Sequence, residues 1–185
     1  MTDNSFSIDV AAIRDQARRK MDAGPVTESY GADPDKVIGI LNEVLATEIV
    51  CWMRYSRHAI SASGINRAQV SGEFTEHAEE EREHAMRIAV RISQLGGEPD
   101  FDPATLAARA HTGYETFADE DLDGMLRENL TAERIVIGTY QEIIRWLGDT
   151  DVTTRRILED ILAEEEEHAD DILDLLGRHA NGSQA

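Results

Sequence analysis

The sequence predicts an all-α fold in which residues 34–177 form four long helices, arranged as two antiparallel hairpins joined by one long crossover. Four segments repeat their apolar residues with the period of an α-helix, and no proline interrupts their interiors. The connection inside each pair of segments is short, whereas the connection between the pairs is long. The two pairs also repeat one pattern of glutamate, tyrosine and histidine. The four segments are residues 34–63, 66–95, 121–147 and 151–177.

Residues 1–33 precede the bundle as an N-terminal extension. Ser7 can cap a short helix that runs to Met21, and Gly24-Pro25 ends it. Four basic residues make this helix locally positive, but acidic residues are interspersed among them. We therefore expect a solvated helix face here in preference to a nucleic-acid-binding arm.

The first hairpin has clear boundary signals. Asp33 is a typical N-cap, and Pro34 occupies the first helical position, where its missing N–H removes no hydrogen bond. Gly64 ends this helix, and Gly96 ends the next one. Because so few residues separate the two helices, they must be antiparallel neighbours.

The second half of the chain begins with the long crossover, residues 96–119. Asp102-Pro103 predicts a short helix within it, over residues 103–111. The helices at 121–147 and 151–177 then form the second hairpin, with glycine after each of them. Residues 178–185 are predicted to be a loose polar tail.

The composition restricts the possible functions. The 185-residue chain carries 18 Lys and Arg against 37 Asp and Glu, so its net charge is −19, which argues against non-specific nucleic-acid binding. A single cysteine, Cys51, excludes an internal disulfide and a Cys-x-x-Cys metal site. No stretch is long and apolar enough to span a membrane, and no secretion signal precedes the helices. We expect a cytoplasmic protein that makes no membrane contact.

Six residues in a duplicated pattern are the candidate metal ligands. A lone mid-helix glutamate precedes a Glu-x-x-His pair in each half, by 33 residues in the first half and 32 in the second. A tyrosine follows each lone glutamate seven residues later. One glutamate from each of two helices and one Glu-x-x-His from each of the others is the ligand set of di-iron carboxylate bundles. The predicted ligands are Glu48, Glu81, His84, Glu133, Glu165 and His168, and the tyrosines are Tyr55 and Tyr140.

Helical spacing places the candidate ligands on the apolar faces. On the first helix, for example, the apolar stripe reads Leu41, Leu45, Glu48, Trp52 and Tyr55. A buried carboxylate without a partner loses several kcal/mol of solvation or stays protonated. Two divalent cations would neutralise four such carboxylates, and oxygen ligands with imidazole suit Fe, Mn or Zn.

Each candidate also has a simpler interpretation. One Glu-x-x-His in so glutamate-rich a chain arises by coincidence, but two in matching halves argue against coincidence. Tyr55 and Tyr140 could simply fill the core, although a hydrogen bond to a ligand is the interpretation we favour. His77 is expected to line an access route or to be a satisfied polar residue, and Glu76 and Glu80 are candidates for an inner surface.

These motifs resemble the bacterioferritin and Dps-like branch of the ferritin superfamily, over about Asp33 to Gly177. The resemblance rests on Leu41–Glu48 with Tyr55, on Glu81-Arg82-Glu83-His84, on Glu128–Glu133 and on Glu165-Glu166-Glu167-His168. It implies that Glu48 and His84 complete one iron site, that Glu133 and His168 complete the other, and that Glu81 and Glu165 bridge them. It implies a ferroxidase that oxidises Fe(II) with oxygen or hydrogen peroxide and stores the ferric product as a mineral.

Two features qualify the resemblance. Bacterioferritins bind haem through a methionine directly after the bridging glutamate, and Arg82 stands at that position, which argues against haem. The short helix expected in the crossover is similar to that of the 12-subunit Dps shell, so we expect a homo-oligomeric shell of that size. A soluble di-metal enzyme without storage, of the peroxidase or manganese-catalase type, uses the same ligands and remains the alternative. A shell in which the metals are purely structural is a third possibility.

Overall fold

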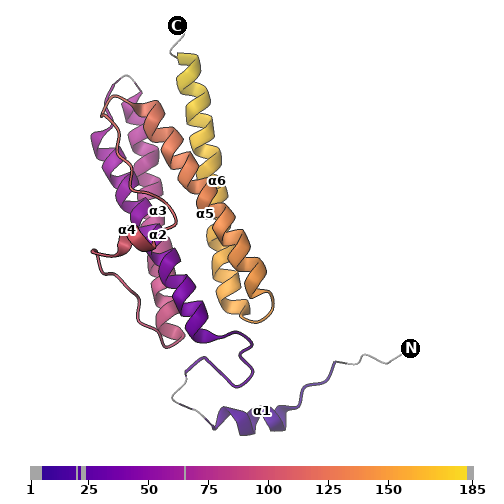
Figure 1. Cartoon of the computed structure of the whole chain (residues 1–185). Helices are drawn as coiled ribbons and strands as arrows, with labels where there is room; N and C mark the ends of the chain where they lie inside the picture. Colours follow the sequence, from indigo (N-terminus) through magenta and orange to yellow (C-terminus); the bar gives the residue numbers. More distant parts are fainter. Residues whose placement is uncertain (1–5, 20, 22–23, 65, 183–185) are drawn as a thin grey trace.

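The computed structural model describes residues 6–19, 21, 24–64 and 66–182, and in this part of the molecule four long helices pack side by side (Figure 1). The contacts between α2 and α3 and between α5 and α6 run along the helices, so each pair forms a hairpin. The predicted all-α fold with two hairpins is therefore confirmed. The helices are α1 (Val10–Ala17), α2 (Pro34–Ser61), α3 (Arg67–Gln94), α4 (Leu106–Arg109), α5 (Leu122–Leu147) and α6 (Val152–Gly182).

The predicted helix boundaries are confirmed where a cap or a glycine defines them. The Asp33 carboxylate accepts a hydrogen bond from the Asp35 amide at 3.1 Å, with Pro34 in the first turn. The chain turns through positive φ at Gly64, Gly96 and Gly148, at or just beyond the ends of three long helices. Glycine adopts this conformation without the steric penalty of a Cβ atom.

Outside the crossover, two helices differ clearly in extent from the sequence-based prediction. The helix in the extension begins after Asp9, whose carboxylate accepts a hydrogen bond from Ala12, and it ends at Ala17. Helix α6 continues through Gly182, so residues 178–182 are helical, and residues 183–185 lie outside the described part. Gly177 does not adopt the positive φ that would end the helix there.

The segment before α2 contacts the turn between α5 and α6, whereas α1 has no buried residue and lies apart from the bundle (Figure 1). The Gly31 amide donates to the Thr150 carbonyl at 3.2 Å, and the Tyr30 hydroxyl donates to the Asp151 carboxylate at 2.6 Å. None of the helices in the described part is both long and apolar enough to cross a bilayer.

The crossover between the hairpins lies along α2 and contains α4, which is shorter than predicted. Arg109 donates to the backbone carbonyl of Asn42 at 2.9 Å, and the His111 amide donates to the Thr47 hydroxyl at 3.0 Å. The fully buried Arg54 donates to the Gly113 carbonyl at 2.9 Å. These bonds fix the crossover against the helix that carries Glu48.

The core consists of two apolar clusters, one toward each end of the bundle. Tyr140 belongs to the first cluster and Tyr55 to the second. The predicted metal ligands lie between them. The assignment of Trp52 to the apolar stripe is wrong, because its side chain is 37% exposed. Cys51, three residues after Glu48, is buried instead, as helical geometry allows equally well.

A buried ion pair connects the two hairpins at the end of the bundle where α6 begins. The Asp151 carboxylate accepts from Arg91 at 3.0 Å and caps α6 by accepting from the Thr154 amide at 2.9 Å. Arg91 is 5% exposed, so Asp151→Ala leaves a buried guanidinium without its counter-charge. We expect this change to lower the free energy of unfolding by about 3–5 kcal/mol, measured by chemical denaturation.

Asp149→Ala is the matched control for that measurement. Asp149 lies in the same turn and pairs with Arg155 at 2.8 Å, but its side chain is 94% exposed. An exposed pair of this kind contributes at most about 1 kcal/mol. Equal losses for the two variants would contradict the assigned role of Asp151.

Candidate metal centre

The six predicted ligands lie together in one layer across the middle of the bundle, and each is at most 2% exposed. Both carboxylate oxygens of Glu81 and of Glu165 accept no well-formed hydrogen bond, and neither does one oxygen of Glu48 and one of Glu133. The Nδ1 atoms of His84 and His168 donate none either, although they lie 2.9 Å and 3.4 Å from the Glu165 carboxylate. Burying so many polar atoms without hydrogen bonds is unfavourable by several kcal/mol. Metal cations would pair with these atoms, so the residues present fit such ions.

The ligand atoms form two groups that share two residues. Glu48, Glu81, His84 and Glu165 make the first group, and their ligand atoms all lie within 4.8 Å of one another. Glu133 and His168 complete the second group, again with Glu81 and Glu165. The two carboxylates that belong to both groups come from α3 and α6. Glu81 and Glu165 could therefore contribute ligand atoms to each of two ions.

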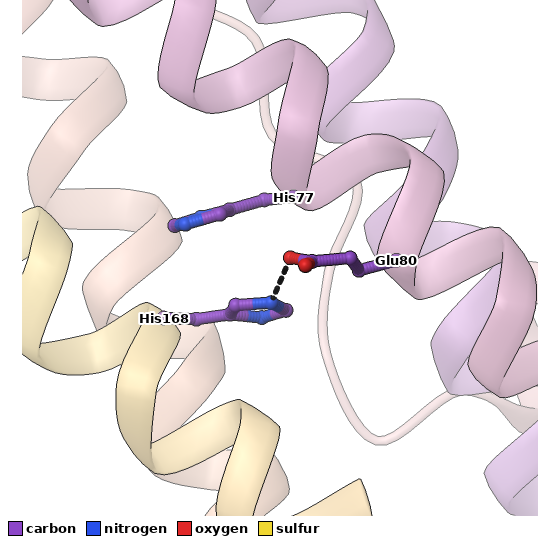
Figure 2. A group of neighbouring side chains, drawn as sticks. All are labelled: His77, Glu80 and His168. Carbon is purple, nitrogen blue, oxygen red and sulfur yellow. Dashed lines mark hydrogen bonds and ion pairs between the residues drawn. The ribbon is translucent and has the colours of Figure 1, made fainter.

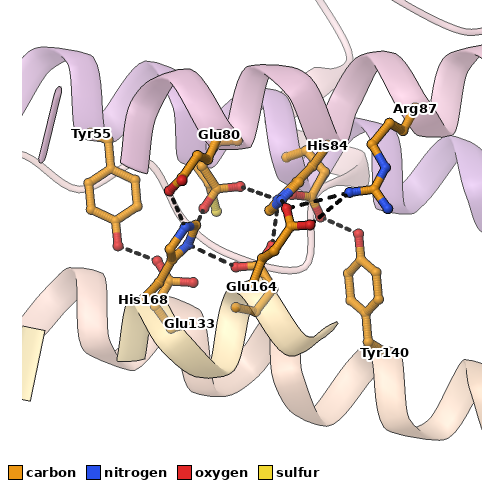
Figure 3. Close-up of polar contacts among 12 residues, drawn as sticks. Tyr55, Glu80, His84, Arg87, Glu133, Tyr140, Glu164 and His168 are labelled. Carbon is orange, nitrogen blue, oxygen red and sulfur yellow. Dashed lines mark hydrogen bonds and ion pairs between the residues drawn. The ribbon is translucent and has the colours of Figure 1, made fainter. Parts of the chain in front are cut away.

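The outer nitrogens of the two histidines contact carboxylates at the edge of the centre. His168 Nε2 lies 2.8 Å from Glu80 Oε2 (Figure 2). His84 Nε2 lies 2.6 Å from Glu164 Oε2, which also pairs with Arg87 (Figure 3). A proton on each Nε2 leaves Nδ1 free to bind an ion in the centre. Such carboxylate contacts fix the imidazole orientation and raise its basicity as a ligand.

These roles of Glu80 and Glu164 were not predicted from the sequence. Glu80 was expected on an inner surface, and no role was predicted for Glu164. A signal was nevertheless present, because each half of the chain reads Glu-Glu-x-x-His, with the second glutamate as the shared ligand. The side chains of Glu80 and Glu164 are 44% and 45% exposed, so an apolar-stripe criterion overlooks them.

Each tyrosine of the repeat donates to the lone glutamate of the opposite half (Figure 3). The Tyr140 hydroxyl donates to Glu48 at 2.7 Å, and the Tyr55 hydroxyl makes a short hydrogen bond to Glu133. Both tyrosines are buried. The bonds cross between the hairpins, so they position one carboxylate in each group of ligands.

Removal of one such hydroxyl should lower the affinity of one ligand group for its ion more than that of the other group. We expect Tyr140→Phe to lower the Fe(II) affinity of the group containing Glu48 by about 10–100-fold. This is the usual range when a residue that hydrogen-bonds to a metal ligand is removed. Anaerobic titration followed by spectroscopy of the bound ions measures this. Tyr114→Phe is the control, because Tyr114 is 45% exposed in the crossover. Equal weakening in both variants would argue against the positioning role.

The metal-free centre retains protons. Burial lowers the pKa of His84, but the carboxylates of Glu165 and Glu48 outweigh it and raise the pKa to about 11. His168 responds in the same way, and Glu165 raises its pKa to about 9. Burial, followed by repulsion from Glu165, raises the pKa values of Glu81 and Glu133 well above that of a free glutamate. Both imidazoles are therefore protonated at neutral pH, and the raised pKa values of Glu81 and Glu133 favour the protonated forms of these two carboxyl groups.

Metal binding must displace these protons, because ligands bind in their deprotonated forms. We expect up to four protons to be released per chain at pH 7, from the four groups with raised pKa values. The apparent affinity should rise with pH, since fewer protons then compete. Titration of the metal-free protein with Zn(II) in weak buffer, followed by a pH indicator, measures the release. Binding without proton release would contradict this account.

A surface cavity of about 110 Å³ lies next to the centre, and carboxylates with two histidines line it. His77 is 2% exposed, and its ring stacks on that of His168 with the centroids 4.1 Å apart (Figure 2). Burial, with a smaller contribution from His168, lowers the pKa of His77 to about 3. His77 and Glu76 both line this cavity, and the access route past His77 stays a prediction.

Comparison with known proteins relates this arrangement to one family. The model of the ferritin-like domain matches residues 38–180. The chain is 28% identical over 144 residues to a DNA protection during starvation protein from Pyrococcus furiosus, covering 77% of this chain and 78% of the relative. It is 27% identical over 140 residues to a bacterioferritin from Desulfovibrio desulfuricans, covering 72% and 70%.

Solved structures show the same fold. A dodecameric thioferritin, the bacterioferritin-related protein from Bacteroides fragilis, is 40% identical, with a TM-score of 0.79 over 83% of this chain and 92% of that one. An archaeal Dps homologue from Halobacterium salinarum is 25% identical, with a TM-score of 0.73 over 80% and 87%.

Proposed function

Because the chain belongs to the ferritin-like family, in its bacterioferritin and Dps-like branch, we propose that it is a ferroxidase that stores iron. It binds two Fe(II) ions per subunit, oxidises them with dioxygen or hydrogen peroxide, and keeps the ferric product as a mineral in a hollow shell. The observation that carries this proposal is the pair of four-residue ligand groups that share Glu81 and Glu165.

The ligand charges fit two divalent ions, and Fe(II) is one of the ions that this ligand set suits. Two divalent ions balance four ionised carboxylates, so the loaded centre is neutral inside an apolar core. Each pair of Fe(II) ions gives up two electrons, which reduce one dioxygen to peroxide or one peroxide, with two protons, to two waters. Glu80 and Glu164 hold the imidazoles in position, while Tyr55 and Tyr140 orient the lone glutamates.

The family supports a homo-oligomeric shell, and we propose twelve subunits. The Bacteroides fragilis relative at 40% identity is described as dodecameric. The short helix α4 in the crossover agrees with the sequence-based expectation of a Dps-type subunit. DNA binding is not part of the proposal, because the net charge of −19 opposes contact with phosphates.

Anaerobic Fe(II) titration of the metal-free protein, followed by exposure to dioxygen or peroxide, tests the proposal. We expect two tightly bound Fe(II) ions per chain, rapid oxidation, and a particle of about twelve subunits that takes up far more ferric iron in soluble form. Particle mass should be recorded on the same sample. Glu83→Gln, which alters an exposed carboxylate of α3, is the control for non-specific iron binding.

Another outcome would favour a different function. Two metals held by a small particle, with no uptake beyond them, would exclude storage. The same centre would then belong to a soluble di-metal enzyme of the peroxidase or manganese-catalase type. Absence of two tightly bound ions would reject both functions.

A further inference from the structure

Arg54 is a buried cation that no carboxylate neutralises by a direct bond. Its side chain is 0% exposed, although arginine is almost never fully buried unless it is paired. In the described part of the chain its guanidinium donates to neutral groups, namely the side chains of Asn129, Thr112 and Cys51 and the carbonyl of Gly113. Burial raises the pKa of the Cys51 thiol to about 12, so this acceptor is neutral as well.

The guanidinium lies on one side of the metal centre. Asn129, which accepts from Arg54 at 2.9 Å, precedes Glu133 by one turn of α5. The guanidinium carbon also lies 6.0 Å from the centroid of the Tyr55 ring, whose hydroxyl donates to Glu133. Figure 3 shows Tyr55 beside Glu133 and His168, at one end of the centre. The charge is therefore nearer to the second ligand group, with Glu133 and His168, than to the first.

The duplicated pattern contains this charge in one half and lacks it in the other. The residue directly before the tyrosine of the repeat is Arg54 in the first half and Thr139 in the second. Four residues before the lone glutamate, the second half has Asn129, whereas the first half has the buried apolar Val44. The charge and its main acceptor thus make two otherwise equivalent sides of the centre unequal.

The other charged groups around the centre are more exposed or are paired. Arg87, on the side of the first ligand group, is 35% exposed and pairs with Glu164 at 3.1 Å. Glu80, which contacts His168, is 44% exposed, so solvent and salt screen its charge. A charge inside the protein acts through a lower effective dielectric constant than these exposed charges do. Arg54 is accordingly the cation with the strongest influence on the second ligand group among the described residues.

We propose that Arg54 weakens the binding of a cation by the second ligand group. A fixed positive charge repels a divalent ion, and the repulsion falls with distance, so the ion of the nearer group experiences more of it. Arg54 thereby makes exchange of that ion with solution easier. The proposal rests on the two-ion centre of the proposed function, but it does not require the oxidation step.

Zn(II) affinity, measured for one ligand group at a time, tests this proposal. Glu48→Gln impairs the first group and Glu133→Gln impairs the second, so each background reports mainly on the other group. We expect Arg54→Gln to tighten Zn(II) binding about tenfold in the Glu48→Gln background and by a smaller factor in the Glu133→Gln background. Competition with a chromophoric chelator gives the dissociation constants. No change in the Glu48→Gln background, or an equal change in both, would overturn the proposal.

Further variants separate the charge of Arg54 from its packing, because Arg54 also holds the crossover in place. In the Glu48→Gln background, Arg54→Lys retains the positive charge but not the forked hydrogen bonds, so the Zn(II) affinity should stay unchanged. Thr112→Val removes one hydrogen bond of Arg54 and keeps its charge, so it should also leave the affinity unchanged. Tighter binding in either variant would assign the effect to packing and overturn the proposal. Arg54→Met, which is uncharged and unbranched, gives the same measurement if Arg54→Gln does not fold.

Repeated oxidation provides a second test, which rests on the proposed ferroxidase function. Repulsion increases with the charge of the ion, so Arg54 opposes retention of Fe(III) more than that of Fe(II). With successive additions of two Fe(II) per chain under dioxygen, the ratio of the later rate to the first rate should be about tenfold lower in Arg54→Gln than in the wild type. Thr112→Val should keep the wild-type ratio.

The outcomes distinguish this inference from the function of the centre. An unchanged ratio of rates in Arg54→Gln would overturn the role of Arg54 in iron release. A wild-type protein that binds two Zn(II) ions but oxidises no Fe(II) would reject the ferroxidase function, whereas tighter Zn(II) binding in Arg54→Gln would still support the effect of Arg54 on affinity.

Discussion

Glu81→Gln is expected to lower the rate of Fe(II) oxidation by at least about a hundredfold. Glu81 belongs to both ligand groups, so its loss removes an anionic ligand from both ions. Loss of a residue that only hydrogen-bonds to a metal ligand already reduces affinity or activity by about 10–100-fold. Loss of a ligand that both groups share should reduce the rate by more than that. Glu165→Gln should behave in the same way. Stopped-flow absorbance after mixing Fe(II)-loaded protein with dioxygen or peroxide measures the rate.

Glu83→Gln is the appropriate control, because Glu83 lies two residues away on α3 with its side chain in solvent. It should oxidise Fe(II) at the wild-type rate. Glu48→Gln and Glu133→Gln change one ligand group each, so their losses should be smaller than that of Glu81→Gln. If all four glutamine variants lost activity equally, the distinction between shared and unshared carboxylates would be wrong.

The duplication made much of this centre predictable from the sequence. A single Glu-x-x-His is weak evidence in so acidic a chain. Its recurrence, each time after a lone glutamate and a tyrosine, predicts that the ligands come from four helices and lie at the same level of the bundle. The structure brings all six predicted ligands into one buried layer. The short connections predicted which hairpins form, and the helical period predicted the face of each helix that is buried.

Partners that meet across helices were not predictable from spacing. Tyr140 donates to Glu48 in the other hairpin, and His84 contacts Glu164, although no sequence rule links these positions. Only the packing of α2 against α5 and of α3 against α6 creates those contacts. Trp52 shows the complementary error. Positions three and four residues after Glu48 fit the stripe almost equally well, and packing selected Cys51 for the interior.

The buried carboxylates also predict how metal binding changes stability. Two ions that bind only the folded chain, each at about 1,000 times its dissociation constant, together stabilise it by about 8 kcal/mol. For a chain of this size about 1 kcal/mol raises Tm by roughly 2–4 °C. Zn(II) at that concentration should therefore raise Tm by about 15–30 °C, measured by calorimetry or circular dichroism. Chelation should reverse the shift.

Without metal, Glu81→Gln should be at least as stable as the wild type at neutral pH. Burial and the charge of Glu165 raise the pKa of Glu81 well above its value in the unfolded chain. At a pH above the unfolded pKa, folding therefore favours uptake of a proton by Glu81, and this lowers the free energy of unfolding. Glutamine removes that penalty, and the advantage should vanish as the pH falls through the unfolded pKa, where the glutamate is protonated in both states. With Zn(II) the order should invert, because the variant lacks the shared ligand. A variant less stable than the wild type without metal would contradict the expected penalty from the raised pKa of Glu81.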